Sequence, residues 1–383
     1  MFLVLMGCSM FVAAKKDEEK VRCIVLFKDQ VDKKIVEDNN GVVLDTYDII
    51  PGLVADLTKS DIKELKKSDK VKSVEEDAQA SILGSKDEDA DQQVKAAGGK
   101  PAPAPKETLP WGVDRIDADI VWAGTDATTG NGIKVAVMDT GIDNDHPDLK
   151  AIIKGGTNTI TSGGSYDDDN GHGTHCAGII AAQHNGEGVK GVAPKIELYS
   201  IKVLNRQGNG WYSDFIEGLQ WAITNKMQVV SMSFGGTGDD AALHAACDQA
   251  NAAGIILVAA AGNEGRELVL YPAAYSTVIA VSATTTSDAL ASYSSYGSSV
   301  DFAAPGSSIY STYKGGGYAT MSGTSMACPH VAGVAALVWG KDKTHTGAEV
   351  VTALLQAENL GTPGWDKYYG WGLVDAENAY KSV

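Results

Sequence analysis

Cysteine is scarce in this chain and forms no disulfide pattern. The 383 residues include five cysteines, and Cys8 and Cys23 lie near the start. The remaining three, Cys176, Cys247 and Cys328, are an odd number and stand in segments of small apolar residues. Small secreted domains that depend on disulfides carry denser, paired cysteines. We therefore expect free, buried thiols and a fold stabilised by its apolar core.

Clusters of basic residues are also missing from most of the chain. Lysine and arginine together number 32, against 49 aspartates and glutamates, and the formal net charge is −17. Binding to nucleic-acid phosphates needs clustered Lys and Arg side chains. The charge balance therefore argues against a nucleic-acid partner and suits an acidic surface that keeps the protein soluble or binds cations.

The apolar stretch at the start, Phe2 to Val12, is shorter than the ~20 residues that cross a bilayer. It ends in two alanines and is followed by charged residues from Lys15. This pattern is typical of a signal peptide, here residues 1–14, and predicts a secreted protein. The alternative is a lipoprotein signal, because Leu5-Met6-Gly7-Cys8 resembles a lipoprotein cleavage box that would leave the chain lipid-anchored through Cys8.

The length and the apolar pattern predict two folded units. A single domain seldom exceeds ~250 to 300 residues, so this chain has room for one large domain and a smaller one. Residues 15–83 alternate short apolar strands with two amphipathic helices, which predicts a small α+β domain. The expected strands are Val21 to Phe27, Gly41 to Thr46, Gly52 to Leu57 and Val71 to Glu75, and the expected helices are Val31 to Asp38 and Lys59 to Ser68.

Residues 84–107 are rich in charged residues, Ala, Gly and Pro, which predicts a linker. In residues 108–383 apolar strands alternate with helices, and this favours an α/β fold with a doubly wound parallel sheet and helices on both faces. Such sheets bind ligands at the carboxyl ends of their strands. The expected strands are Ile133 to Met138, Leu198 to Val203, Val229 to Phe234 and Ile255 to Ala260, with helices from about His172, Ser213 to Thr224 and Asp240 to Ala253.

Two polar residues stand where such a sheet would present them. Asp139 directly follows an expected strand, although a carboxylate there more often only caps a helix. His172 lies between two glycines, at a turn before a helix of small apolar residues. The spacing of His172 and His175 would allow both to ligate zinc. However, no Glu stands beside them and no second ligand cluster is present, which argues against a zinc site.

Ser325 stands at the start of another helix of small and apolar residues, after a turn that contains glycine. A serine in this place is usually only a helix cap. Its backbone N–H would also point out of the positive end of the helix, where a developing negative charge is stabilised. Aspartate, histidine and serine therefore occur in three segments that a sheet of this kind could bring together.

In this order and with these neighbours, the three segments closely resemble the subtilisin family of serine endopeptidases, from Trp111 to Asp375. The resemblance implies that Asp139, His172 and Ser325 form a catalytic triad and that Asn263 is the side-chain donor of the oxyanion hole. An esterase of the α/β-hydrolase class has the chain order Ser, acid, His, and is excluded. The alternative is a catalytically silent peptide-binding module on the same fold, although no expected catalytic residue is missing.

The resemblance also implies a groove for protein and peptide substrates. Leu270 falls where the family lines the base of its primary specificity pocket, which predicts a shallow pocket for medium-sized apolar side chains. Ser322 stands where the family usually has Asn, and we expect this difference to affect local stability or binding and to leave the triad intact. The residues expected to line the groove are Gly208, Gly210, Ser233, Phe234, Gly235, Ala260, Gly262 and Leu270.

A structural Ca²⁺ ion is implied by the loop from Gln183 to Val189 and by Asp148, which resemble the family's high-affinity calcium site. Calcium takes several oxygen ligands, including backbone carbonyls. The resemblance assigns side-chain oxygens to Asp148, Asn185 and Glu107, and carbonyl oxygens to Gln183, Glu187 and Val189.

Residues 15–83 resemble the inhibitory propeptide of the same family, with Val74 to Asp77 in its last strand. The resemblance implies a monomeric precursor that is inhibited by its own propeptide. Counting forward from this strand places the self-cleavage site between Leu83 and Gly84. The linker and Leu109 to Val113 look most like archaeal thermophilic members of the family.

Overall fold

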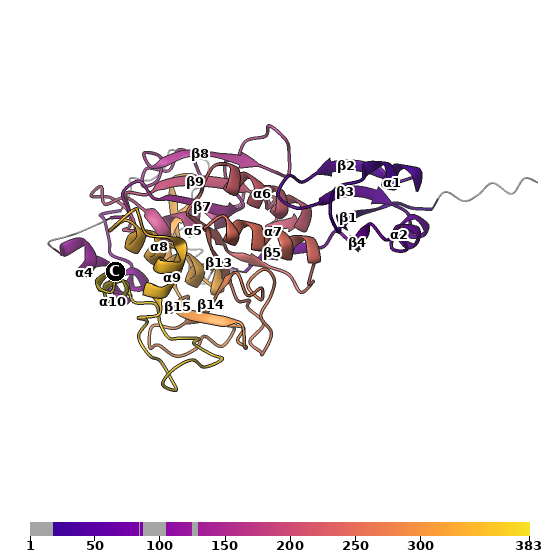
Figure 1. Ribbon diagram of the computed structural model, residues 1–383. Coiled ribbons are helices and arrows are strands. Elements are labelled where there is room, and N and C mark those ends of the chain that lie inside the picture. The colour runs from indigo at the N-terminus through magenta and orange to yellow at the C-terminus, as the bar shows by residue number, and fades with distance from the viewer. Residues whose placement is uncertain (1–17, 84, 87–104, 125–128) are drawn as a thin grey trace, which may run out of the picture.

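The computed structural model describes residues 18–83, 85–86, 105–124 and 129–383 (Figure 1). The expected signal peptide at residues 1–14, Gly84 and most of the expected linker lie outside the described residues. Among the described residues, no helix combines the length and the apolar character needed to span a bilayer.

A parallel sheet forms the centre of the larger domain. Within the described residues it has seven strands in the order β15-β14-β13-β11-β7-β9-β8, and every neighbouring pair is parallel. The long apolar runs predicted strands of this kind, because a parallel sheet is covered on both faces. The strands are β7 (Lys134–Asp139), β8 (Ile153–Asn158), β9 (Glu197–Lys202), β11 (Val229–Met232), β13 (Ile256–Ala260), β14 (Ile279–Thr284) and β15 (Val300–Pro305).

Alternate residues of the central strands face two separate apolar cores. In β7, Val135 and Val137 pack with residues of α5 and α8, whereas Ala136 and Met138 pack with residues of α6 and α7. Helices therefore cover both faces, and the predicted doubly wound α/β fold is confirmed. The helices of this domain are α3 (Trp111–Arg115), α4 (Ala118–Ala123), α5 (His172–Ala181), α6 (Tyr212–Thr224), α7 (Ala241–Ala252), α8 (Thr324–Trp339), α9 (Gly347–Leu354) and α10 (Ala376–Lys381).

The N-terminal domain is an antiparallel sheet of order β2-β3-β1-β4, shown in indigo in Figure 1. In β1, Cys23 and Val25 face the domain's own core, while Ile24 and Leu26 belong to the core that contains α6 and α7. One face of this sheet thus packs on the larger domain. Its elements are β1 (Val21–Phe27), α1 (Lys33–Asp38), β2 (Val42–Thr46), β3 (Gly52–Leu57), α2 (Lys59–Leu65) and β4 (Val71–Glu76).

Two carboxylates of the N-terminal domain meet helix starts of the larger domain. Asp77 accepts hydrogen bonds from the backbone N–H (3.1 Å) and the hydroxyl (2.7 Å) of Ser213, in the first turn of α6. Glu75 accepts a hydrogen bond of 3.4 Å from the N–H of Ala241, the first residue of α7. Arg22 forms an ion pair of 3.0 Å with Asp77. Because the start of a helix carries free N–H groups and positive charge, these contacts fix how the two domains dock.

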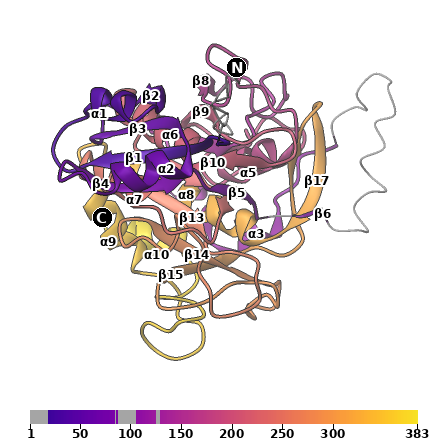
Figure 2. The same ribbon diagram turned by 90° about the vertical axis from the view of Figure 1, so that its right-hand side faces the viewer.

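After β4 the chain crosses the larger domain as two further strands. β5 (Gln79–Ile82) lies between β10 (Asn209–Trp211) and β12 (Phe234–Gly235) and is antiparallel to both. β6 (Ser85–Lys86) then pairs with β17 (Gly317–Ser322), which also pairs with β16 (Ile309–Tyr313). Figure 2 shows β6 beside β17. Residues 79–82 and residues 85–86 are therefore both held by backbone pairing.

Local differences from the sequence prediction have clear causes. The expected strand Val229 to Phe234 ends at Met232, because Phe234 and Gly235 leave the large sheet to pair with β5. The first residues of the expected linker form β6, since their backbone finds a partner in β17. The helix expected from Val31 starts at Lys33, where the side chain of Asp32 caps the first turn. All four cysteines that the structure describes are free and buried, as expected.

The close approach of α5 to β16 depends on a glycine in the helix. A Cβ atom on Gly178 would lie closer than 3.0 Å to the hydroxyl oxygens of Thr312 and Ser311. We expect Gly178→Ala to lower the melting temperature, because overpacking costs about 1–3 kcal/mol and outweighs the gain in helix propensity of at most ~1 kcal/mol.

The matched control is Gly218→Ala in α6, where the nearest atom to the new Cβ is the flexible end of Met138 at 2.9 Å. Thermal melts monitored by circular dichroism should show the smaller loss for Gly218→Ala. Equal melting temperatures for the two variants would contradict the assigned role of Gly178.

Candidate active site

Asp139 and His172 form a buried pair at the carboxyl edge of the sheet. Asp139 is the last residue of β7, and His172 is the first residue of α5. The Nδ1 atom of His172 lies 2.8 Å from Oδ1 and 3.0 Å from Oδ2 of Asp139, and both residues are 0% exposed. The backbone N–H of Thr140 also donates to Asp139 Oδ1 at 2.7 Å. This geometry holds the imidazole ring in one orientation.

The environment of His172 favours its protonated form. Burial by itself lowers the pKa of this imidazole, but the charge of the adjacent Asp139 carboxylate outweighs that effect and holds the pKa well above its usual value. The second ring nitrogen, Nε2, is buried and has no hydrogen-bond partner among the described residues. His172 can therefore take up a proton at Nε2, with Asp139 stabilising the resulting imidazolium.

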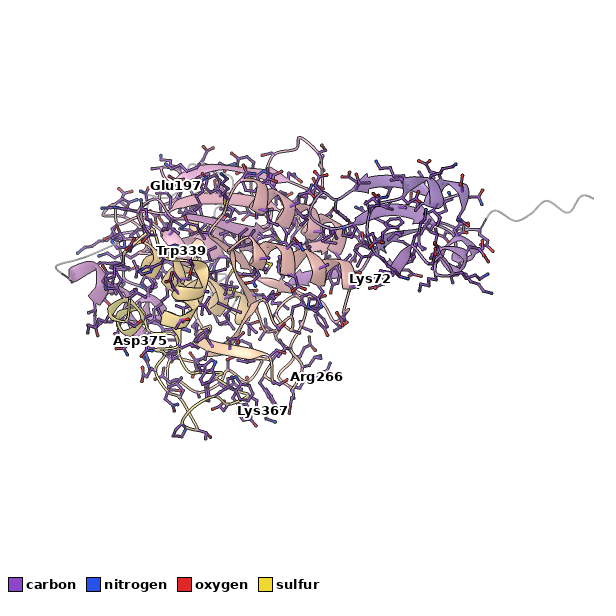
Figure 3. All side chains as sticks on the ribbon, viewed as in Figure 1. Lys72, Glu197, Arg266, Trp339, Lys367 and Asp375 are labelled. Atoms are coloured by element: carbon purple, nitrogen blue, oxygen red, sulfur yellow. The ribbon has the colours of Figure 1, made fainter. Side chains whose placement is uncertain are left out.

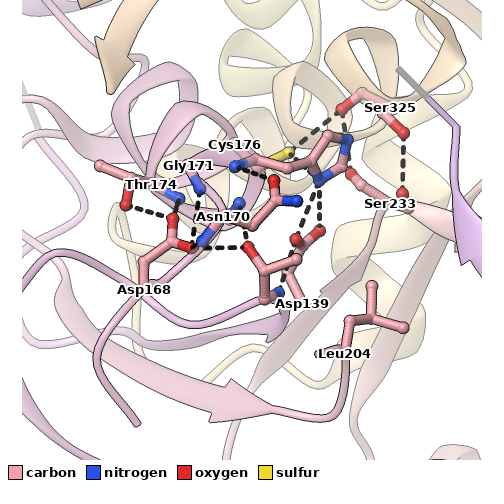
Figure 4. Close-up of polar contacts among 12 residues, drawn as sticks. Asp139, Asp168, Asn170, Gly171, Thr174, Cys176, Leu204, Ser233 and Ser325 are labelled. Carbon is pink, nitrogen blue, oxygen red and sulfur yellow. Dashed lines mark hydrogen bonds and ion pairs between the residues drawn. The ribbon is translucent and has the colours of Figure 1, made fainter. Parts of the chain in front are cut away.

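Ser325 is the second residue of α8 and is 0% exposed. Its hydroxyl donates a hydrogen bond of 2.7 Å to the Ser233 carbonyl and accepts one of 3.0 Å from the N–H of Leu83. Cys176 links Ser325 to the pair, because its sulfur lies 3.5 Å from the Ser325 carbonyl oxygen and 3.9 Å from His172 Nδ1 (Figure 4). The three predicted residues are thus neighbours, although the Ser325 hydroxyl is turned toward Ser233 rather than His172.

The carbonyl group of Leu83 lies at the start of α8. Its oxygen accepts hydrogen bonds from the Asn263 side-chain amide and from the Ser325 N–H, the latter at 3.4 Å. The Asn263 amide is held in place because its oxygen accepts two hydrogen bonds of 2.9 Å from the N–H and the hydroxyl of Thr324. Two donors and the positive end of a helix therefore meet at one carbonyl oxygen.

The strand before Leu83 occupies an extended groove. The N–H of Ile82 donates to the Gly208 carbonyl at 2.9 Å, and the N–H of Leu83 lies 3.4 Å from the Ser233 carbonyl. The predicted groove residues Gly210, Phe234 and Gly235 pair with Ala80, Ile82 and Ser81. A peptide bound in this way adds a strand to the domain, which gives backbone affinity with little dependence on sequence.

The side chain of Leu83 is buried against the predicted specificity pocket. Leu83 and Leu270 belong to one cluster of buried apolar side chains, together with Ala260. A Cβ atom on Gly235 would lie 3.0 Å from Leu83, and one on Gly262 would lie 2.9 Å from Leu270. The absence of side chains at both glycines therefore leaves room for the side chains of Leu83 and Leu270.

Residues 85–86 pair with β17, the strand that precedes α8. Gly84 lies outside the described residues, and the backbone of Ser85 and Lys86 pairs with Ser322 and Met321. The Ser322 hydroxyl accepts a hydrogen bond of 2.8 Å from the N–H of Ser308. Ser322 therefore fixes a neighbouring loop through its side chain and holds the following segment through its backbone.

The expected calcium ligands gather around one buried carboxylate. Asp148 is 0% exposed and accepts hydrogen bonds of 3.1 Å from the Asn185 amide, the Val189 N–H and the Tyr318 hydroxyl. The Asn185 amide oxygen in turn accepts from the N–H of Glu187 at 2.9 Å. The carbonyl oxygens of Asp148 and Gln183 accept hydrogen bonds from the N–H groups of Gln183 and Asn185, both at 3.0 Å.

Glu107 is engaged differently from the other expected ligands. One of its carboxylate oxygens accepts a hydrogen bond of 2.9 Å from the Gly186 N–H, and the other lies 3.4 Å from the Lys190 ammonium. Glu107 thus links the residues before α3 to the loop that carries Asn185. The ammonium group of Lys190 would compete with a bound cation for the negative charge of Glu107.

The side chain of His175 contacts backbone carbonyl groups rather than His172. Its Nε2 atom lies 3.1 Å from the carbonyl oxygens of Ile309 and Ala319, and burial lowers its pKa to about 3. Burial likewise lowers the pKa of His330 to about 4. Both imidazoles are neutral residues of the core.

Sequence reasoning missed several residues that orient the site. Thr324 fixes the Asn263 amide, Thr140 contacts Asp139, and Asp168 binds the turn before α5. Thr324 could have been found because it precedes Ser325 at the start of the same helix. Asp168 gave no such signal, since it stands in a run of three aspartates that resembles any acidic loop.

The chain matches two family models and many known proteins. Residues 130–372 match the subtilase family, and residues 13–82 match peptidase inhibitor I9. The chain is 42% identical to a thermostable alkaline protease of Halalkalibacterium halodurans, over 96% of this chain and 94% of the relative. It is 40% identical to subtilisin E of Bacillus subtilis, over 96% and 92%.

A third relative, the minor extracellular protease Epr of Bacillus subtilis, is 38% identical over 94% of this chain and 54% of its own length. These relatives do not test the predicted likeness to archaeal thermophilic members, which stays a prediction. The predicted family is confirmed by the two models and by the relatives. The chain therefore belongs to the subtilase family and is a subtilisin-type serine protease that carries a propeptide inhibitor domain at its N-terminal end.

Proposed function

We propose that this protein is a secreted endopeptidase that uses Asp139, His172 and Ser325 as a catalytic triad and cuts itself from its propeptide. The observation that carries the proposal is the position of the Leu83 carbonyl, which lies between the Asn263 amide and the Ser325 N–H while the Ser325 hydroxyl contacts the Leu83 N–H. This is the arrangement expected of a peptide bond ready for nucleophilic attack.

The proposed reaction proceeds through an acyl-enzyme. The Ser325 hydroxyl rotates from the Ser233 carbonyl to His172 Nε2, gives its proton to that nitrogen, and its oxygen bonds to the scissile carbonyl carbon. Asn263 and the Ser325 N–H stabilise the resulting oxyanion. The C–N bond then breaks as His172 returns the proton to the leaving amine. Water hydrolyses the ester by the same steps, and Asp139 stabilises the imidazolium each time.

The first substrate is proposed to be the bond between Leu83 and Gly84 of the same chain. Because the scissile bond is already bound, the first cut is intramolecular and its rate is independent of protein concentration. After the cut, β5 and the domain before it keep their contacts with β10, β12, α6 and α7. The released propeptide therefore remains bound as a product inhibitor until it dissociates or is degraded.

We expect Ser325→Ala to accumulate as an uncut precursor and Asn263→Ala to slow cleavage by about 10²- to 10³-fold, the usual effect of removing one oxyanion donor. Purified wild-type precursor should give a new N-terminus at Gly84 before any trimming toward Thr108. The measurements are gel electrophoresis over time and mass spectrometry of the products.

The matched control is Ser311→Ala, which removes the hydroxyl of another buried serine. Ser311 is 1% exposed, and its hydroxyl donates a hydrogen bond to the His175 carbonyl. This variant should still cut itself. Cleavage of purified Ser325→Ala after Leu83, or a first cut in wild type between Lys100 and Glu107, would overturn the self-processing model.

We also propose a structural Ca²⁺ ion beside Asp148. Asp148 is fully buried, yet no Lys or Arg pairs with it among the described residues, and its hydrogen bonds come from neutral groups. A buried carboxylate without a cation is costly. The side chains of Asp148 and Asn185 and nearby carbonyls are the oxygen ligands that calcium prefers, and a bound ion would add charge neutralisation and cross-link the loop to the residues before it.

Because an ion that binds only the native state stabilises it by mass action, chelation should lower the melting temperature of the protein. Asp148→Asn should melt at a lower temperature and lose its response to added calcium. The control Asp145→Asn, an exposed carboxylate three residues earlier, should respond as wild type does. Identical melting curves of wild type with and without the ion, after its removal is verified by elemental analysis, would rule the site out.

Carboxyl groups crowd the interface between the propeptide and the peptidase domain. Burial raises the pKa of Asp77, and it raises the pKa values of Asp214 to about 6, of Glu217 to about 7 and of Asp240 to about 7. Carboxylates across the interface act in the same direction: Asp77 on Asp214, Asp45 on Glu217 and Glu75 on Asp240. Arg22 opposes these shifts at Asp77, Asp214 and Glu217 but does not reverse them.

These shifts predict that the propeptide binds more weakly as the pH rises. Release re-exposes the carboxyls and returns their pKa values toward about 4, so the complex binds more protons than its separated parts. The resulting stabilisation of the complex is complete below about pH 4 and is lost as the pH rises through 6 to 7. We expect the inhibition constant of added propeptide for mature enzyme to increase by about tenfold or more from pH 5 to pH 8.

The variant Asp214→Asn cannot ionise, so it should show a shallower pH dependence than wild type when both are titrated with the same propeptide. An inhibition constant that is flat between pH 5 and pH 8, or that falls, would contradict the proposed linkage.

We further propose that the protein acts outside the cell as a monomer. The expected signal peptide at residues 1–14 supports export, and one relative is named as an extracellular protease. Anchoring through Cys8 remains the alternative form of export. Mass spectrometry of the protein recovered from culture medium tests both, because a lipid-anchored chain would stay with the membrane and begin at an acylated Cys8.

A further inference from the structure

We propose that Asp168 is a positioning residue that holds Asp139 and His172 in contact by tying the end of β7 to the start of α5. The proposal rests on the function proposed for Asp139, His172 and Ser325. Asp168 touches neither the substrate segment nor the Ser325 hydroxyl. It acts through Thr140 and through the first turn of α5, as the network in Figure 4 shows.

Both carboxylate oxygens of Asp168 are fully used. Asp168 is 8% exposed, and Oδ1 accepts three hydrogen bonds of 2.9 Å, from the Thr140 hydroxyl and from the N–H groups of Asn170 and Gly171. Oδ2 accepts from the N–H of Thr174 at 3.0 Å and from its hydroxyl at 2.6 Å. Five donors thus converge on one side chain, and four of them belong to residues within two positions of His172.

Thr140 carries this restraint from Asp168 to the catalytic carboxylate. Its hydroxyl donates to Asp168 and accepts a hydrogen bond of 2.9 Å from the N–H of Gly173, the residue after His172. Its N–H donates to Asp139 Oδ1 at 2.7 Å, and its carbonyl oxygen accepts from the buried ammonium of Lys202. One residue therefore contacts Asp139, Asp168 and the first turn of α5 at the same time.

The two backbones that Asp168 joins are in direct contact. A Cβ atom on Gly173 would lie 3.1 Å from the Cβ of Asp139. No side chain separates the end of β7 from the start of α5 at this point, so the separation of Asp139 from His172 follows the position of the helix start. A displacement of about 1 Å between catalytic groups can cost about 10²-fold in rate.

Only an ionised carboxylate satisfies this set of donors. A carboxylate has two acceptor oxygens, whereas an asparagine amide has one acceptor and one donor group. Asp168→Asn has nearly the same shape, but its NH₂ group must face either Thr174 or the group formed by Thr140, Asn170 and Gly171. In both cases donors oppose one another, and either the helix start or Thr140 must move.

The test compares Asp168→Asn with Asp375→Asn in the full-length precursor. Asp375 is also 8% exposed and also caps a helix, accepting from the N–H (2.8 Å) and the amide (2.6 Å) of Asn378. It has no contact with the triad, and it lies at the far side of the peptidase domain from Lys72 of the propeptide (Figure 3). The readouts are the first-order rate of self-cleavage from pH 5 to pH 10 and the melting temperature.

We expect both variants to melt at a lower temperature, but only Asp168→Asn to cut itself more slowly, by about 10²-fold at the optimum. The acid limb of its rate–pH profile, where the rate falls at low pH, should also move to lower pH. Activity requires neutral His172, and the Asp139 carboxylate raises the pKa of that imidazole. A looser contact lets the pKa fall, so neutral His172 persists to lower pH, an effect that loss of stability alone would not produce.

A second pair of variants keeps the proposal testable if Asp168→Asn does not fold. Thr140→Val removes the bridging hydroxyl and should reproduce the slow cleavage and the shifted acid limb, whereas Thr140→Ser keeps the hydroxyl and should restore both. The role of Asp168 would be overturned if folded Asp168→Asn cut itself at the wild-type rate with an unchanged rate–pH profile at low pH. If Asp168→Asn cannot be purified, the same result for Thr140→Val would overturn it. Self-cleavage of Ser325→Ala would overturn the proposed triad instead, so the two failures are distinct.

Discussion

Helix α8 is buried along its whole length, and its amino-terminal end is the fixed point on which the site depends. All 16 residues from Thr324 to Trp339 are buried, and the helix packs on β11, β13, β14 and β15. Close packing of this kind leaves no room for a side chain at Gly333, where a Cβ atom would lie 2.7 Å from the Cβ of Val192. The rigid helix presents the Ser325 N–H beside Asn263, at the edge where β7 delivers Asp139.

The protein stabilises its buried carboxylates with few cations. Asp139 is paired with an imidazole, Asp168 with five neutral donors, and Asp77 with a helix start and Arg22. Helix starts and backbone N–H groups supply the positive ends of dipoles at fixed positions. Such partners are set by the fold rather than by flexible side chains, which suits a site that must hold its geometry. A net charge of −17 is therefore compatible with acidic residues at the centre of the molecule.

The sequence predicted the fold class and the family better than it predicted how the candidate site is arranged. Strands such as β7 and β13 were predictable because parallel strands are continuous apolar runs, and Asp139, His172, Asn263 and Ser325 stand in recognisable motifs. The strands β8, β14, β15, β16 and β17 were not predicted. In β8, β16 and β17, glycines and polar residues obscure the pattern. Contacts of Asp168 were also invisible, because they join backbone groups that only the folded chain brings together.

Inhibition and the proposed self-cleavage would use the same contacts in this protein. The pairing of β5 with β10 and β12 places the Leu83 carbonyl at the proposed oxyanion hole, and the same pairing keeps other substrates out of the groove. In the observed state the Ser325 hydroxyl donates to the Ser233 carbonyl, whereas attack requires it to donate to His172. Because this change is a rotation about one side-chain bond, a small motion separates the resting from the reactive arrangement. A fold can therefore present its own chain as a substrate and still remain closed to others, provided that the strand stays docked after the cut.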